Sequence, residues 1–254
     1  MKTQNDYKPV NDFGLLLIGP PLSGKTTVAM QFPNPYIIST DRKIGNATSR
    51  LPKDKKWWFD YVDVDDANQP VALDKQWTRA TDLLKAAPSK PEIQTIIWDN
   101  LSDLSNMLYA HIIANGGTKL TVGGERVFEQ QHWQPFKLLM SRAISFARSS
   151  GKLFVVCCHE DIEKDEVTGT LTYRPLIPGQ LKNQLGGFFT DVWRTEVSAS
   201  PSQAAKYYVR TVPTPRMALG NSIAGLPIEF EFEWSKFQAL MSGSQKEPNS
   251  AKPS

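Results

Sequence analysis

The residues with the clearest chemical potential form a glycine-rich segment near the amino terminus. It reads G-P-P-L-S-G-K-T from Gly19 to Thr26 and matches the pattern G-x-x-x-x-G-K-[ST] in full. In this pattern the backbone N–H groups turn inward around a phosphate, and the start of the following helix adds partial positive charge. Lys25 is expected to reach the β- and γ-phosphates, and the Thr26 hydroxyl to ligate Mg²⁺. The segment therefore predicts a site for ATP and Mg²⁺ formed by Gly19, Pro20, Pro21, Leu22, Ser23, Gly24, Lys25, Thr26 and Thr27.

A nucleotide site of this kind needs a carboxylate for the metal ion at the end of a neighbouring buried strand. The apolar run Thr95-Ile-Ile-Trp98 ends in Asp99. We expect Asp99 to support Mg²⁺ together with Thr26. The alternative is that Asp99 only caps the helix that follows, since Asp and Asn are favoured N-cap residues.

The group that positions an attacking water is harder to assign. Many ATPases of this broad type place Glu directly after the metal-linked Asp, but Asn100 has that position here. Asp41 closes the second apolar run, at the sheet edge where ligands gather, and is our first choice. Alternatively, Asp41 only begins a solvated turn. Asp103, a group from another subunit, or very slow hydrolysis are the remaining alternatives.

A histidine ends a further apolar run. His159 follows Phe154–Cys158 and precedes Glu160. A polar residue at that strand end can sense the γ-phosphate and relay its presence to the following loop. Without the glycine-rich segment, His159 would be interpreted as a structural histidine. We therefore predict catalytic roles for four residues: Lys25, Asp41, Asp99 and His159.

These groups need a framework that sets several strand ends side by side. Five apolar runs are too short for helices and fit strands buried on both faces of a parallel sheet: Gly14–Gly19, Pro35–Thr40, Trp57–Val62, Gln94–Trp98 and Lys152–Cys158. Apolar residues at spacings of three and four predict helices over Leu73–Ala87, Leu101–Ile112 and Phe136–Ala147. The alternation predicts an α/β fold, with a mostly parallel sheet flanked by helices.

After Cys158 the pattern changes to short β-like segments. We expect added or antiparallel strands at one sheet edge: Val167–Tyr173, Asp191–Val197, Lys206–Val212 and Ile228–Trp234. The chain divides into a lead-in at 1–11, one folded domain at 12–240 and a tail at 241–254. The tail is expected to be disordered because it is rich in Ser, Lys, Pro, Asn and Gln.

Composition excludes several classes of protein. The 254 residues are 40% apolar, which suffices for a packed core, and the net charge of +3 excludes a polycation that binds nucleic acid by charge alone. No apolar run approaches the roughly 18 to 20 residues of a membrane span, and none resembles an export signal at the start. The adjacent Cys157 and Cys158 form neither a disulfide framework nor a metal-ligand spacing. We expect a reduced, cytoplasmic protein without membrane contact.

Together the motifs resemble the RecA-like branch of P-loop ATPases, and specifically the short phage nucleotide-binding proteins that act as single-strand annealing ATPases. The matching pieces span about residues 12–230: the glycine-rich segment, the strands ending in Asp41 and Asp99, the strand ending in His159, and Pro175–Trp193. The resemblance implies a RecA-like core, ATP hydrolysis with Mg²⁺, annealing of single-stranded DNA in phage recombination, and a ring or filament of identical subunits in the host bacterial cytoplasm. A single-strand DNA-binding protein is a further partner to consider. The catalytic carboxylate of RecA-like proteins resembles Asp41 in its location, although Glu is usual there.

The same resemblance implies that the loops after the Asp99 and His159 strands face single-stranded DNA. Here these loops lie at about 115–134 and 160–184. The first is glycine-rich and basic, and its His132 and Trp133 could stack on a base. The second is acidic along its first half, so an ordinary solvated surface is the alternative for its basic residues. The expected DNA contacts are Lys119, Arg126, Arg174 and Lys182.

RecA-like rings also complete the ATP site with a basic residue of the neighbouring subunit. Arg210 and Arg216 are the candidates for this residue.

Three other functions compete with the annealing ATPase. A small-molecule kinase needs an arginine-rich lid, and none stands out. A protein-remodelling ATPase of the AAA type needs a helical lid after the core, where this chain is β-rich. A nucleotide-dependent switch with incidental turnover stays open because Glu is missing after Asp99.

Overall fold

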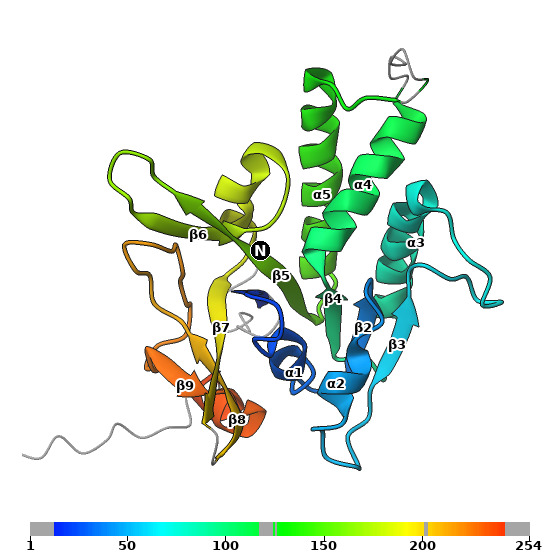
Figure 1. Ribbon diagram of the computed structural model, residues 1–254. Coiled ribbons are helices and arrows are strands. Elements are labelled where there is room, and N and C mark those ends of the chain that lie inside the picture. Colours follow the sequence, from blue (N-terminus) through cyan, green and yellow to red (C-terminus); the bar gives the residue numbers. More distant parts are fainter. Residues whose placement is uncertain (1–12, 117–123, 125, 201–202, 242–254) are drawn as a thin grey trace, which may run out of the picture.

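The computed structural model describes residues 13–116, 124, 126–200 and 203–241. A mixed sheet of nine strands forms its centre, in the order β3-β2-β4-β5-β1-β7-β8-β9, with β6 paired to β5 outside this path. The α/β fold predicted from the sequence is confirmed (Figure 1). The strands are β1 (Gly14–Gly19), β2 (Pro35–Ser39), β3 (Trp58–Tyr61), β4 (Thr95–Asp99), β5 (Leu153–Lys164), β6 (Leu171–Pro175), β7 (Asp191–Ser200), β8 (Gln203–Arg210) and β9 (Glu229–Glu231).

Six neighbouring strands, from β3 to β7, run parallel and end at one edge of the sheet. Their register aligns the polar residues that follow the apolar runs. Gly19 lies opposite His159, Asp99 lies opposite Cys157, and Ser39 lies opposite Asp99. The sheet therefore brings the ends of β1, β2 and β4 and residue His159 of β5 to a single edge.

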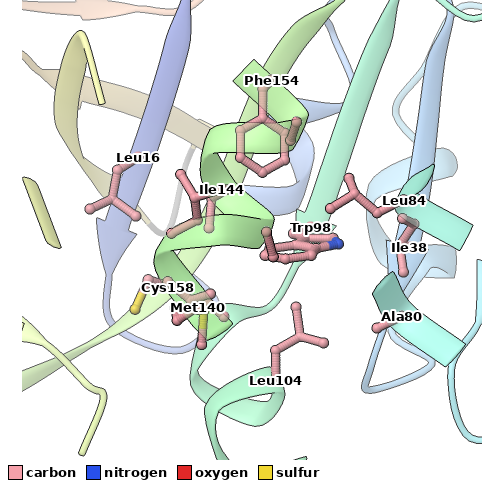
Figure 2. Packing of buried hydrophobic residues seen from close by; sticks show 14 of the residues in the cluster. Leu16, Ile38, Ala80, Leu84, Trp98, Leu104, Met140, Ile144, Phe154 and Cys158 are labelled. Atoms are coloured by element: carbon pink, nitrogen blue, oxygen red, sulfur yellow. The ribbon is translucent and has the colours of Figure 1, made fainter. Parts of the chain in front are cut away.

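Helices cover both faces of this sheet, and alternate side chains of each buried strand enter different cores. Leu16 and Ile18 of β1 belong to the cluster under α3 (Leu73–Ala86), α4 (Leu101–Asn115) and α5 (Trp133–Arg148). Leu15 and Leu17 belong to the cluster under α1 (Lys25–Ala29), α2 (Ile44–Thr48) and α6 (Trp234–Met241). Burial on both faces explains why the strand reads as an unbroken apolar run. Figure 2 shows the first cluster around Trp98, with Met140 and Ile144 of α5 beside it.

The segment after His159 differs from the loop that we expected at 160–184. β5 continues to Lys164 and pairs with antiparallel β6, so this segment begins as a β-hairpin. Its turn is built by Asp165, whose carboxylate accepts the N–H groups of Val167 and Thr168. The predicted strand at Val167–Tyr173 therefore starts later, at Leu171. The second strand of the hairpin was therefore predicted with shifted bounds, whereas the extension of β5 over residues 160–164 was not predicted, because its mostly charged residues carry no apolar run.

The carboxyl-terminal strands confirm the predicted antiparallel addition. β7 pairs with β8 and β8 with β9, both antiparallel. The predicted strand Ile228–Trp234 is only partly extended, because Trp234 begins α6 and Phe237 of that helix is fully buried. The lead-in 1–11 and the tail after Met241 lie outside the described residues. None of the helices in the described part of the chain has the length and apolar character that spanning a bilayer requires.

Candidate nucleotide-binding site

The glycine-rich segment forms a loop between β1 and α1, with its lysine held inside. The ammonium of Lys25 donates hydrogen bonds to the carbonyl oxygens of Gly19 at 2.9 Å and Pro20 at 2.8 Å. The side chain is buried, and burial lowers the pKa of Lys25. The loop faces a cavity of about 570 Å³, lined from this segment by Pro21, Leu22, Gly24, Lys25, Thr26 and Thr27. Gly19, Pro20 and Ser23 are absent from the lining and support the loop.

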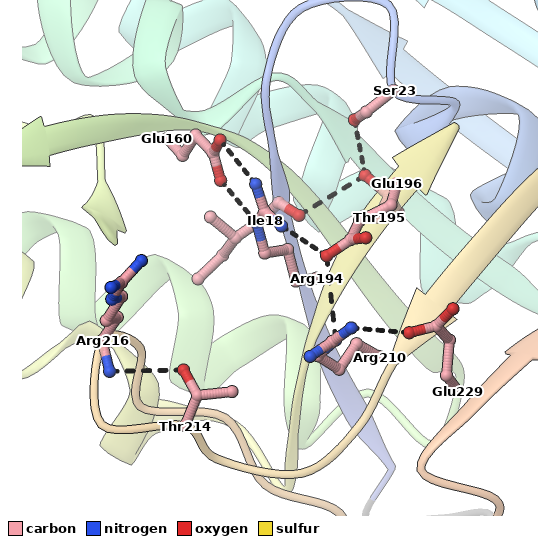
Figure 3. Close-up of polar contacts among 10 residues, drawn as sticks. All are labelled: Ile18, Ser23, Glu160, Arg194, Thr195, Glu196, Arg210, Thr214, Arg216 and Glu229. Carbon is pink, nitrogen blue, oxygen red and sulfur yellow. Dashed lines mark hydrogen bonds and ion pairs between the residues drawn. The ribbon is translucent and has the colours of Figure 1, made fainter. Parts of the chain in front are cut away.

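Strand β7, which pairs with β1 on the side opposite β5, holds the glycine-rich loop in place. The hydroxyls of Ser23 and Thr195 lie 2.6 Å apart and share a buried hydrogen bond (Figure 3). A β-carbon at Gly19 would lie 2.5 Å from the Thr195 oxygen and 2.6 Å from the Ser23 oxygen, so this position has no room for a side chain. Thr195 is a supporting residue that the sequence did not reveal, since the contact joins residues 172 positions apart.

The two predicted metal ligands lie in direct contact. The Thr26 hydroxyl of α1 donates a 2.7 Å hydrogen bond to the Asp99 carboxylate at the end of β4, although β5 lies between β4 and β1. A hydroxyl and a carboxylate are the hard oxygen ligands that Mg²⁺ accepts, and the ion commonly takes its other ligands from phosphates and water. The described residues contain no group of three His, Cys, Asp or Glu side chains that could hold a metal. The oxygen donors of Thr26 and Asp99 fit a magnesium ion that arrives with a nucleotide.

Helix capping falls to Asn100 rather than to Asp99. The Asn100 side chain accepts the Asp103 N–H at 2.8 Å and donates to the Asp103 carboxylate at 2.9 Å. The Thr40 hydroxyl donates a third bond to Asp103 at 3.0 Å. Asp103 is thus held in the α4 cap, which weakens its case as the base.

Asp41 and His159 line the same cavity as Lys25, Thr26 and Asp99. Asp41 forms an ion pair of 3.1 Å with Lys43. His159 donates its backbone N–H to Ser102, and its Nδ1 is buried without a partner in the described chain. Burial and then the nearby Lys25 charge lower the pKa of His159, which favours a neutral imidazole. All four predicted catalytic residues are therefore gathered around one cavity.

Tyr207 of β8 and Arg50 after α2 complete the rim of this cavity. A β-carbon at Gly24 would lie 2.0 Å from the Tyr207 ring, and Gly24 has a left-handed φ of 88°. We expect Gly24→Ala to lower nucleotide affinity at least about 10-fold, because the methyl group displaces either the ring or the loop. Calorimetric titration with ATP and Mg²⁺ measures this. Gly45→Ala is the control, since its β-carbon would meet nothing within 4 Å; equal losses in both variants would contradict the prediction.

Asp99 makes the stability of the metal-free protein depend on pH. Burial raises its pKa from 3.8 to about 6; the nearby Asp41 adds to this, while Thr26 and Lys25 oppose it. The folded state then holds a proton that the unfolded state releases between these values, so stability falls as pH rises from about 4 to 6. In EDTA at pH 7, Asp99→Asn is expected to raise the free energy of unfolding by about 3 kcal/mol, the free-energy equivalent of this pKa shift. Urea unfolding at pH 5 and pH 7 tests this; an unchanged pH dependence in the variant would contradict it.

The expected DNA contacts are engaged within the chain. Arg126 donates to the Ile113 and Ala114 carbonyls at the end of α4. Arg174 and Lys182 both pair with Glu163 of the β5–β6 hairpin. Lys119 lies outside the described residues.

The two aromatic residues proposed for base stacking are packed. His132 is buried in the 3₁₀ turn Gln130–His132. Trp133 contacts the Phe128 ring at 4.7 Å, and a β-carbon at Gly179 would lie 2.5 Å from its ring. This arrangement does not present either ring as an open stacking platform.

The two arginines expected to act on a neighbouring subunit differ in their surroundings. Arg210 pairs with Glu229 at 2.7 Å and with Glu196 at 3.7 Å. Arg216 is exposed, and its guanidinium has no ion pair within the described residues (Figure 3). Of the two, Arg216 is the freer cation.

The fold and the site define a P-loop NTPase with a mostly parallel sheet flanked by helices. A family model described as an AAA domain matches residues 12–222, and the chain therefore belongs to the AAA domain family. No curated protein matches the chain. Among solved structures, the crystal structure of the flagellar accessory protein FlaH from Methanocaldococcus jannaschii is similar at a TM-score of 0.38 and 11% identity, over 80% of this chain and 78% of that chain.

Proposed function

We propose that this P-loop NTPase binds single-stranded DNA in an ATP-dependent manner and promotes strand annealing in phage recombination, hydrolysing ATP to ADP and phosphate. The observation that carries the ATPase part is the convergence of Lys25, the Thr26–Asp99 pair, Asp41 and His159 on one cavity. The DNA part is supported by the resemblance of the sequence motifs to phage annealing ATPases. It also requires a homo-oligomer, as a ring or filament, in the host bacterial cytoplasm.

Each residue of the cavity has a role that its position supports. The loop N–H groups and Lys25 bind the triphosphate, and Thr26 with Asp99 would hold Mg²⁺, which supplies charge neutralisation at the phosphates. The Asp41 carboxylate accepts a proton from the attacking water, and His159 contacts the γ-phosphate side of the cavity. Binding of ATP would favour the oligomer that holds DNA, and hydrolysis would release it.

The DNA contacts are proposed at the segments after β4 and β5. Arg174 and Lys182 share a single acidic partner, Glu163, so these two positive charges exceed the one negative charge of that partner by one. A phosphate backbone could bind this excess charge. Lys119 and Arg126 are proposed to contribute from the first segment, and Arg216, with Arg210 as the alternative, to reach a neighbouring ATP site. A single-strand DNA-binding protein is a proposed further partner.

Steady-state ATP hydrolysis with Mg²⁺, measured with and without single-stranded DNA, tests this function. Stimulation of wild-type turnover by DNA, absent from Lys25→Ala, is the expected result. Annealing of complementary labelled strands with ATP, ADP and no nucleotide then tests the role in recombination. If DNA did not change turnover and nucleotide did not change annealing, the proposed role with DNA would be contradicted. The proposed ATPase activity would be unaffected by these results.

A nucleotide-dependent switch is the second candidate, and two observations favour it. Asn100 replaces the Glu that many ATPases place after the metal-linked Asp, and Asp41 is tied to Lys43 by an ion pair. A switch binds ATP and changes its oligomeric state or partner without appreciable turnover. Single-turnover hydrolysis measured beside light scattering separates this candidate from the ATPase.

A further inference from the structure

The rim of the nucleotide cavity carries an aromatic–cation pair that phosphate binding does not use. The Arg50 guanidinium carbon lies 4.6 Å from the centroid of the Tyr207 ring. Both residues line the same cavity as Lys25 and Asp99, although Arg50 follows α2 and Tyr207 lies on β8. The pair therefore joins two elements from opposite sides of the phosphate-binding loop.

The two members of this pair are held very differently. Tyr207 is half-buried on a strand that pairs with β7, and its ring lies directly against Gly24 of the loop. Arg50 is exposed, and within the described residues its side chain has no ion pair or hydrogen bond. The Tyr207 ring is thus held in place by its strand and by Gly24. The Arg50 guanidinium has only the ring as its partner within the described residues.

We propose that Tyr207 and Arg50 form the nucleobase subsite of this cavity. The base of a nucleoside triphosphate stacks on the Tyr207 ring in the place that the guanidinium now holds, and Arg50 closes over the outer face of the base. A nucleobase that lies between an aromatic ring and a guanidinium plane is stabilised by stacking and by cation–π attraction. This assignment rests on the proposed nucleotide binding at the loop.

The chemistry of the pair also defines the ligand class. Every base offers a π-face, so the subsite distinguishes nucleoside triphosphates from inorganic polyphosphates rather than selecting one base through hydrogen bonds. The larger apolar area of a purine gives it an advantage over a pyrimidine. We therefore expect ATP and GTP to bind more tightly than CTP and UTP.

Competition binding with ATP and inorganic tripolyphosphate, both with Mg²⁺, tests the subsite. Tyr207→Ala is expected to weaken ATP binding about 10-fold, the loss of one stacked base, while tripolyphosphate binding stays unchanged. Tyr207→Phe keeps the ring and should bind as the wild type does. Tyr208→Ala is the matched control, because the next residue of a strand points to the opposite face of the sheet.

The outcomes separate this inference from the function on which it rests. Selective loss of ATP affinity in Tyr207→Ala supports the subsite. Equal weakening of both ligands would mean that the ring only supports the loop through Gly24, and tighter ATP binding would mean that the ring obstructs the site; either result overturns the proposal. Lys25→Ala should weaken both ligands, and a wild-type protein that binds neither would overturn nucleotide binding itself.

Discussion

Lys25→Ala is expected to abolish measurable ATP turnover, with a loss of at least about 100-fold, the effect of removing one donor from developing charge in a buried site. The Lys25 ammonium is held by the carbonyl oxygens of Gly19 and Pro20 and faces the cavity beside Asp99. Its removal takes away the positive charge that opposes the β- and γ-phosphates. Nucleotide affinity should fall as well, which calorimetric titration with ATP and Mg²⁺ measures.

A second lysine in the chain provides a matched control for this variant. Lys55 also donates to two backbone carbonyls, those of Gln31 and Phe32, each at 2.8 Å, and burial lowers its pKa too. It lies outside the nucleotide cavity, so Lys55→Ala should keep ATP affinity and turnover while losing some stability. If Lys25→Ala retained normal nucleotide affinity, the interpretation of the loop as a phosphate site would be wrong.

Asp41→Asn is expected to keep ATP and Mg²⁺ binding but to lower turnover by about 100-fold or more, the usual contribution of a general base. Asparagine preserves the size of the side chain but cannot accept the proton of the attacking water. Asp41 also lies close enough to Asp99 to raise the pKa of that carboxyl, so the substitution should lower the Asp99 pKa. Metal binding at pH 6 should therefore strengthen slightly in the variant.

Asp103→Asn distinguishes Asp103 from Asp41 as the base. The Asp103 carboxylate accepts hydrogen bonds from Thr40 and Asn100 in the α4 cap, so this variant should lose stability and keep turnover. Rapid-quench measurement of the hydrolysis step, beside ATP binding, gives the comparison. Unchanged turnover in Asp41→Asn would contradict the assignment of the base.

The sequence predicted the parallel core well because burial on both faces leaves a direct signal. Strands such as Gly14–Gly19 are continuous apolar runs that end at glycine, proline or acidic residues, and the observed β1 has the same bounds. The extension of β5 over residues 160–164 was missed because four of its five residues are charged and follow no apolar pattern, whereas β6 was predicted, with shifted bounds, at Val167–Tyr173. The short helix α2 was missed because five residues give too few positions for a period.

The candidate site was predictable where its residues are consecutive or end a strand. The loop from Gly19 to Thr26 and the carboxylate of Asp99 meet these conditions, and the structure brings them into contact. Thr195, Arg50 and Tyr207 do not meet them. They reach the loop through the pairing of β7 and β8 and through the chain after α2, which local sequence does not encode.

Strand β5 has a mechanical consequence beyond the site itself. It passes without a break from the buried core, through His159 at the cavity, to Lys164 in the hairpin with β6. Directly after His159, Glu160 is clamped by two hydrogen bonds from the Arg194 guanidinium of β7 (Figure 3). Strand β5 therefore connects the cavity to the hairpin without a break, and the Glu160–Arg194 contact lies at the junction. We therefore expect a backbone change at His159 to reach the hairpin through this strand and this contact.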